Sequence, residues 1–96
     1  MVTVGLLVTL TAKAGKQPEL AEFLREAVTV AEAEPDTAAW YAARLDDTTF
    51  AVFEVFGGQA GRSDHLRAAQ TLAARAEELL ESPPVVKPID IVAAKG

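Results

Sequence analysis

The sequence predicts a single α+β domain over residues 1–96, with the element order strand, helix, strand, strand, helix, strand. Three observations predict this order. Segments near both ends alternate apolar residues with a period of two, two further strand-like segments in the middle are joined by a tight turn, and two stretches repeat apolar residues at helical spacing. A length of 96 residues suits one domain with one core.

The first strand is expected over residues 2–10, where every second residue is apolar and the second face is only partly polar. Gly15 then interrupts the chain. Pro18 suits the first turn of a helix, because the N–H that proline lacks has no helical partner there. One apolar stripe follows at spacings of three and four: Leu20, Phe23, Leu24, Ala27, Val28 and Ala31. The Glu-Pro-Asp sequence at 34–36 should end this helix.

The middle of the chain predicts a β-hairpin. Residues 37–45 and 48–56 read as strands, and Asp46 with Asp47 fits a tight turn between them. The second strand is apolar on both faces, with Phe50, Val52 and Phe56 opposed to Ala51, Phe53 and Val55. One carboxylate, Glu54, stands inside this apolar run.

The last third of the chain predicts a helical region and a final strand. The helical region covers about residues 59–81 and is expected to be interrupted near residues 66–70. Its apolar side consists of Leu72, Ala73, Ala76, Leu79 and Leu80. The final strand is expected over residues 85–93, and Pro88 within it cannot donate a hydrogen bond, so this strand should lie at a sheet edge or carry a bulge.

This element order is that of the ferredoxin-like fold, in which both helices pack on one face of a four-stranded antiparallel sheet. The other face would then be bare, although Ala51, Phe53 and Val55 make it apolar. A bare face of this kind exceeds the apolar patch that soluble monomers usually expose. We therefore expect a homodimer in which two copies pack sheet against sheet.

Composition disfavours several classes of function. The net charge of -5 disfavours nucleic acid as a partner. No apolar run approaches the roughly 18 residues needed to cross a bilayer, and no leader pattern follows the first methionine. Cysteine is absent, which excludes disulfides and thiolate metal sites. We expect a cytoplasmic protein without a nucleic-acid or membrane partner.

Residues 34–74 resemble the antibiotic biosynthesis monooxygenase domain, a dimeric α/β-barrel family among the ferredoxin-like folds. The resemblance rests on Glu34 with Pro35 before the second strand, on the aromatic, aliphatic and glutamate pattern of residues 50–54, and on His65 at the opening of the second helical region. The first strand, the Ala-Gly-Lys turn at 14–16 and the first helix match as well. The resemblance therefore covers nearly the whole chain, and it carries fold more safely than function.

The resemblance implies a cofactor-independent monooxygenase that oxidises a small phenolic or anthrone-like compound to a quinone. In such enzymes the activated substrate itself reacts with oxygen. The protein supplies a closed apolar pocket, a proton acceptor and hydrogen bonds to the developing enolate, and neither metal nor cofactor is expected. The same family includes a haem-degrading branch, whose site needs an asparagine on the first strand beside a histidine and a tryptophan. This sequence contains no asparagine, so haem degradation ranks well below quinone formation.

His65 and Glu54 are the candidate catalytic residues. His65 is the only histidine, and an imidazole can accept a proton near neutral pH. In the other interpretation, Ser63 or Asp64 caps the helix and His65 is a partly exposed residue of its first turn. A single histidine also argues against a zinc site, which needs three or four converging ligands.

Glu54 would be buried if it shares the apolar face of Phe50 and Phe56. Such burial costs several kcal/mol unless a partner is near, and Arg44, Arg62 and backbone donors are the candidates. Glu54 is then either a structural carboxylate that fixes the hairpin or a group at a pocket edge that assists proton transfer.

Trp40, Tyr41, Phe53 and Arg44 are the candidate substrate-binding residues. Trp40 and Tyr41 lie on opposite faces of their strand, so at most one faces the helices, and both also suit a core or a dimer interface. Small neighbouring alanines leave volume for a flat aromatic ligand. Two alternatives to an enzyme remain: a non-catalytic small-molecule-binding or accessory dimer, and a structural dimer whose pocket is filled by Trp40, Phe53 and Phe56.

Overall fold

A computed structural model of the chain describes residues 4–58, 66–67, 70–71 and 73–95. The elements in chain order are strand β1 (Val4–Thr11), helix α1 (Gln17–Glu32), strands β2 (Thr37–Arg44) and β3 (Thr49–Phe56), the short 3₁₀ helix η1 (Glu77–Leu79) and strand β4 (Val85–Asp90). The described residues just before η1 are helical, at 66–67, 70–71 and 73–75. The predicted element order and the ferredoxin-like fold are confirmed.

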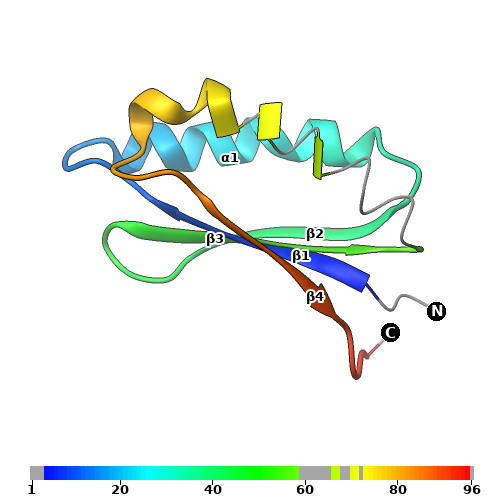
Figure 1. Ribbon diagram of the computed structural model, residues 1–96. Coiled ribbons are helices and arrows are strands. Elements are labelled where there is room, and N and C mark those ends of the chain that lie inside the picture. The colour runs from blue at the N-terminus through cyan, green and yellow to red at the C-terminus, as the bar shows by residue number, and fades with distance from the viewer. Residues whose placement is uncertain (1–3, 59–65, 68–69, 72, 96) are drawn as a thin grey trace.

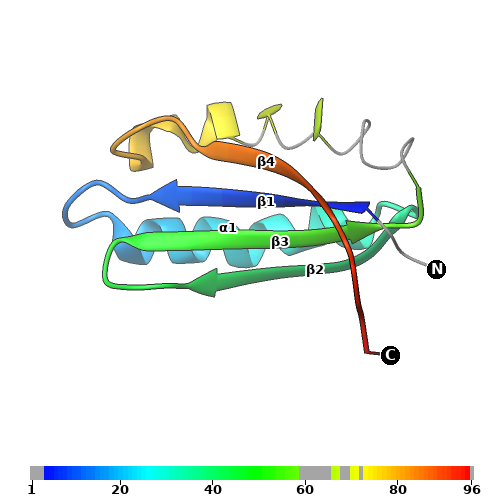
Figure 2. The ribbon, with the colours of Figure 1, turned by 60° about the horizontal axis from the view of Figure 1, so that its bottom comes forward.

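The four strands form one antiparallel sheet in the order β2-β3-β1-β4. Figure 1 shows α1 and the helical residues before η1 on the same face of this sheet. Figure 2 shows the opposite face, where the strands lie side by side with α1 behind them. Strand β4 is an edge strand, as Pro88 predicts.

The core lies between the sheet and α1. Every second residue of β1 is buried against the helix layer, which is the alternation that the sequence predicts. Helix α1 buries Leu20, Leu24, Ala27 and Ala31, one stripe at spacings of four, three and four. Among the described residues, no helix combines the length and the apolarity needed to cross a membrane.

One row of side chains on the uncovered face of the sheet is apolar on β2, β3 and β1 and ends in Lys87 on β4. Strand pairing places Tyr41 beside Phe53, Phe53 beside Leu7, and Leu7 beside Lys87, so one row of side chains crosses the whole sheet. Tyr41 is 64% exposed and Phe53 is 38% exposed. Within the described part of the chain, no helix covers this row (Figures 1 and 2).

Two features of the strands differ from the prediction. Strand β4 ends at Asp90 instead of residue 93, and Val92, beyond its end, is 97% exposed. The pairing of β2 with β3 shifts by one residue between Thr37 and Ala39, an irregularity of the β-bulge kind. Alternation of residue types does not reveal this shift, because Ala38 and Ala39 suit either face.

The turn of the hairpin is held by its own side chains. Oδ1 of Asp46 accepts hydrogen bonds from the backbone N–H groups of Thr48 and Thr49, at 3.0 and 2.8 Å. These bonds, with that of Thr48 the largest contribution, hold the pKa of Asp46 below its ordinary value. Arg44 donates to the carbonyl oxygens of Asp46 and Asp47 at 3.3 and 2.9 Å, and its guanidinium carbon lies 5.2 Å from the centre of the Phe50 ring.

Gly5 lies where β1 and β3 approach closely. A Cβ atom at this position would overlap the backbone carbonyl oxygen of Glu54, which cannot swing away as a side chain could. We expect Gly5→Ala to lower the free energy of unfolding by about 1–3 kcal/mol, the range found for overpacked sites. Urea denaturation at one protein concentration measures this change. Gly57→Ala is the control, because a Cβ there meets no atom within 4 Å. Equal effects of the two substitutions would contradict the prediction.

Candidate functional site

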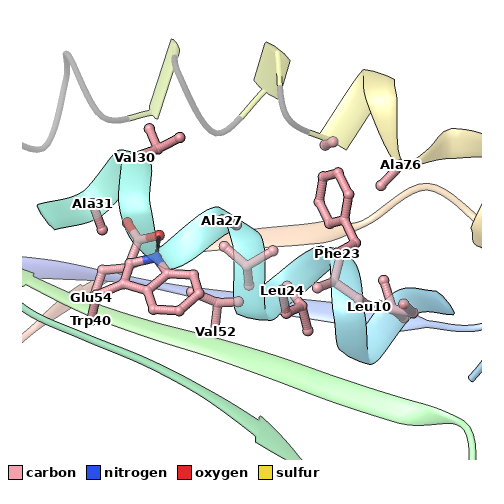
Figure 3. A pocket seen from close by; sticks show the side chains of 13 residues that line it. Leu10, Phe23, Leu24, Ala27, Val30, Ala31, Trp40, Val52, Glu54 and Ala76 are labelled. Carbon is pink, nitrogen blue, oxygen red and sulfur yellow. Dashed lines mark hydrogen bonds between the residues drawn. The ribbon is translucent and has the colours of Figure 1, made fainter. Parts of the chain in front are cut away.

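A pocket opens between the sheet and α1, on the covered face of the sheet. Figure 3 shows Trp40 and Glu54 at one end of it and Leu10, Phe23 and Ala76 toward the other. The described residues that line it come from β1, α1, β2, β3 and the helical region before η1: Val8, Leu10, Leu20, Phe23, Leu24, Ala27, Val30, Ala31, Trp40, Val52, Glu54, Ala73 and Ala76. Apart from Glu54 and the indole N–H of Trp40, these side chains are hydrocarbon.

The pocket is narrow. The space between its side chains, together with open solvent at its mouth, amounts to about 550 Å³. Within that space, the centre of a water molecule fits in only about 50 Å³. That space holds a few water molecules. A ligand with several rings therefore needs side chains such as Phe23 to move. The space is not filled by the three aromatics that the sequence suggested: Trp40 lines it, whereas Phe53 lies on the uncovered face and Phe56 is buried beside Val4 and Leu6.

Glu54 shares the covered face with the large apolar residues of β3. Its pairing partners are Leu6 on β1 and Trp40 on β2, and the residue is only 2% exposed. Among the described residues, Glu54 is the one charged residue whose side chain is buried. A carboxyl group in such a position needs hydrogen-bond partners, because its transfer from water to an apolar surrounding costs several kcal/mol.

Trp40 supplies one of these partners. Its indole Nε1–H donates a hydrogen bond of 2.9 Å to Oε1 of Glu54. The pair forms because the β2–β3 register sets the two residues directly opposite each other on one face, where side chains of neighbouring strands meet. The bond fixes one oxygen of the carboxyl group at the end of the pocket (Figure 3). The sequence did not indicate this pair, since strand register depends on the turn and on the shift near Ala38.

The arginine that the sequence offered as a partner lies elsewhere. Arg44 is engaged with the carbonyl oxygens of the hairpin turn and with Asp47, whose Oδ1 is 3.6 Å from its Nη2. Arg44 does not line the pocket that holds Glu54. Arg62 and the predicted catalytic residue His65 lie outside the described residues.

The remaining predicted site residues face other surfaces. Tyr41 and Phe53 neighbour each other on the uncovered face of the sheet. Tyr41 and Arg44 also line a second hollow, a groove between α1 and the β2 edge, together with Arg25. Water can reach about 430 Å³ of this groove because it is open to solvent. Its charged groups have partners already, since Arg25 pairs with Glu22 at 3.1 Å and Arg44 holds the turn. The pocket that holds the buried carboxyl group of Glu54 is therefore the better candidate site.

Sequence reasoning missed the contribution of α1 to the pocket. Phe23, Ala27 and Val30 line it, although the sequence places Phe23 and Ala27 only in an apolar stripe. Their spacing shows which residues face the sheet but does not show where the packing leaves space. Among the described residues, no group of three or more histidine, cysteine, aspartate or glutamate side chains is placed to hold a metal ion.

The chain is similar to several proteins of known structure. NE2512 from Nitrosomonas europaea, a protein of unknown function, is 42% identical, with a TM-score of 0.92 over 99% of this chain and 94% of that protein. A candidate antibiotic biosynthesis monooxygenase from the same organism superposes with a TM-score of 0.83 at 16% identity, over 98% of this chain and 94% of that one. Another from Caulobacter crescentus gives a TM-score of 0.79 at 18% identity, over 96% and 92%.

At such low identities the last two likenesses show the fold alone. The likeness to NE2512 is close enough to show common family membership. Neither a family model nor a curated protein sequence matches the chain.

The bond between Trp40 and Glu54 predicts a measurable contribution to stability. Trp40→Phe keeps an aromatic ring but removes the donor from a buried oxygen, and we expect it to lower the free energy of unfolding by about 1–3 kcal/mol. Tyr41→Phe on the exposed side of the same strand should change it by less than about 0.5 kcal/mol. Urea denaturation measures both. Trp40→Phe should cost less when Glu54→Met is already present, and equal costs in both backgrounds would show that the bond contributes nothing.

Proposed function

We propose that the chain, which shares a family with NE2512 and a fold with candidate antibiotic biosynthesis monooxygenases, is a homodimeric, cofactor-independent monooxygenase. Its substrate is a small phenolic or anthrone-like aromatic compound, and its product is a quinone. The observation that carries this proposal is the buried carboxyl group of Glu54 at the end of a pocket whose other described side chains are hydrocarbon apart from the indole N–H of Trp40.

Such a pocket suits an oxidation that begins with loss of a proton. An apolar lining favours a flat aromatic ring and excludes water, and one carboxylate at its end can accept a proton from that ring. Because water is scarce there, the hydrogen bond from Trp40 has greater influence on the orientation of the carboxylate than it would in solvent. Trp40 thus lines the pocket with its ring and holds Glu54 with its N–H.

The proposed reaction consumes one molecule of oxygen and releases one molecule of water. For an anthrone, Glu54 accepts a proton from the ring CH₂ group, and the resulting anion gives an electron to O₂. The radical pair recombines with formation of a C–O bond, and the peroxide takes the proton back. Loss of water then breaks the O–O bond and the remaining C–H bond and leaves the C=O group of the quinone. The carbon is oxidised and O₂ is reduced, so no further oxidant or reductant is needed.

The other predicted site residues take different places in this proposal. His65 stays a candidate second proton acceptor. We assign Tyr41 and Phe53 to the dimer interface, because both lie on the uncovered face of the sheet. Arg44, which holds the hairpin turn and lines the outer groove, would act on a substrate only through that groove.

The homodimer is supported by the row of side chains that crosses the uncovered face. Tyr41, Phe53 and Leu7 are neighbours in this row, and they present ring and hydrocarbon surface to solvent in the isolated chain. A second copy packed sheet against sheet would bury them and would leave both pockets, on the helix side, accessible.

Oxygen consumption tests the reaction. We expect the chelator-treated protein to consume oxygen with anthrone, and Glu54→Gln to lower the rate at least about 100-fold, the usual contribution of a proton acceptor. Glu26→Gln, at an exposed position of α1, is the matched control and should keep the rate. His65→Ala tests the second candidate in the same assay.

Three outcomes of this assay are informative. An unchanged rate in Glu54→Gln would contradict the role of Glu54 as proton acceptor. An unchanged rate in His65→Ala would contradict that role for His65. Binding of aromatic compounds with no oxygen consumption above background would favour the alternative, a non-catalytic small-molecule-binding or accessory dimer.

The dimer is tested by a charge on the uncovered face. Phe53→Lys should raise the dissociation constant of the dimer about thirtyfold or more, as loss of a central aromatic contact usually does. Leu45→Lys is the control, because Leu45 is a similarly apolar residue, 61% exposed, beyond the end of β2. Light scattering over a dilution series measures both variants. A wild-type protein that is monomeric at all concentrations would refute the interface.

A further inference from the structure

The pocket between the sheet and α1 is too small for an aromatic ring as it stands. The centre of a water molecule fits in about 50 Å³ of it, whereas a cavity of about 150 Å³ is needed to hold one benzene ring. A ring compound therefore binds only if a lining side chain moves.

Exposure shows where the pocket meets solvent. Of the 13 described lining residues, nine are buried, and four are partly exposed: Phe23, Val30, Trp40 and Ala73. Buried side chains are fixed by their neighbours on all sides, because protein interiors are close-packed. Among the described residues, the side chain that moves should therefore be one of these four.

Trp40 is a fixed wall of the pocket. Trp40 and Leu24 also line the outer groove between α1 and β2, so their side chains separate the two hollows. The indole N–H of Trp40 is bonded to Oε1 of Glu54 at 2.9 Å, and Leu24 is buried. A ligand that entered from the groove would have to break that bond or displace a core side chain.

Phe23 differs from the other partly exposed residues. Phe23 and Val30 belong to α1, and Ala73 belongs to the helical region before η1, so these three border the pocket between the two segments. Ala73 is small, and Val30 is β-branched and therefore stiff about χ1. The Phe23 ring carries no polar atom that could hold it by a hydrogen bond, and two χ1 rotamers are common for aromatic residues in helices.

We propose that Phe23 is the residue that controls entry to the pocket: its ring fills the outer end in the free protein, and an aromatic ligand binds by replacing it. The ligands are flat, since they take the place of a flat ring. Figure 3 shows Phe23 at this end, with Leu10 and Ala76 and away from Trp40 and Glu54. The proposal deepens the proposed function, on which it rests for the identity of the ligand site, but it needs no reaction.

A gate of this kind acts on the association rate. A ligand enters only those molecules whose Phe23 ring is turned outward, so kon and the affinity both fall with that fraction. Because Phe23 is already partly exposed, the outward turn removes only part of its burial, and we expect the inward position to be favoured about tenfold. A side chain that merely fills space would instead change koff.

The experiment measures binding of 2-naphthol to the full chain in the absence of oxygen. Line-shape analysis of the indole ¹H–¹⁵N signal of Trp40, the single tryptophan, gives kon and koff over a titration. We expect Phe23→Ala to raise kon about tenfold. Val28→Ala is the matched control and should change kon less than about twofold, because Val28 is partly exposed on the same helix but lines the groove and not the pocket.

Two results would overturn the proposal at this stage. One is an unchanged kon in Phe23→Ala, and the other is an equal increase in Val28→Ala. Thermal unfolding confirms that each variant is folded before titration. If Phe23→Ala does not fold, Phe23→Leu, which keeps a branched apolar side chain without the ring, takes its place with the same expected direction.

The wild type tests the displacement directly. On binding of 2-naphthol we expect nuclear Overhauser effects between the ligand and the methyl groups of Leu10 and Ala76, at the Phe23 end of the pocket (Figure 3). We also expect a change in the Hα–Hβ couplings of Phe23, which report χ1. Binding with these couplings unchanged would refute the gate, and so would failure of 2-naphthol to bind up to its solubility limit.

The outcome is independent of catalysis. A faster kon in Phe23→Ala without oxygen consumption by the wild type would leave this inference standing and remove the proposed reaction. Oxygen consumption together with an unchanged kon would remove the inference and leave the reaction.

Discussion

The site depends on one constraint, the placement of a carboxyl group among hydrocarbon side chains on the covered face of the sheet. Glu54 is 2% exposed, and burial of that kind is tolerated only with hydrogen-bond partners. The β2–β3 register meets part of the requirement by setting the Trp40 indole N–H 2.9 Å from Oε1. The hairpin turn and the shift near Ala38 therefore matter to the site, because a slip of one residue would turn Trp40 to the other face.

Strand β3 lies at the centre of both surfaces that the proposals use. Its covered face contributes Val52 and Glu54 to the pocket, and its uncovered face contributes Phe53 to the row shared with Tyr41. The two surfaces are separated by one sheet, so the proposed assembly through the uncovered face would leave the pocket on the helix side open to ligands.

Much of the fold could be predicted from the sequence. Alternation in β1, the three and four spacing in α1 and the edge position of Pro88 report local geometry, and the structure confirms each. The burial of Glu54 could be predicted only on the condition that its side chain shares the apolar face of Phe50 and Phe56. Its bond to Trp40 could not, because a cross-strand pair depends on register, and register depends on the turn and the irregularity near Ala38. The sequence suggested Arg44 as the partner of Glu54 because of its positive charge. In the structure the Arg44 side chain bonds the hairpin turn instead.

The most direct test of the central claim, that ligands bind beside Glu54, is a ligand titration followed by ¹H–¹⁵N nuclear magnetic resonance. Trp40 is the single tryptophan of the chain, so its indole gives one signal, and that signal comes from the N–H that bonds Glu54. On addition of 2-naphthol, the indole signal and the backbone amides of Leu24 and Val52 should show the largest shifts. Shifts confined to Tyr41 and Lys87 on the uncovered face, with the indole signal unmoved, would contradict the claim.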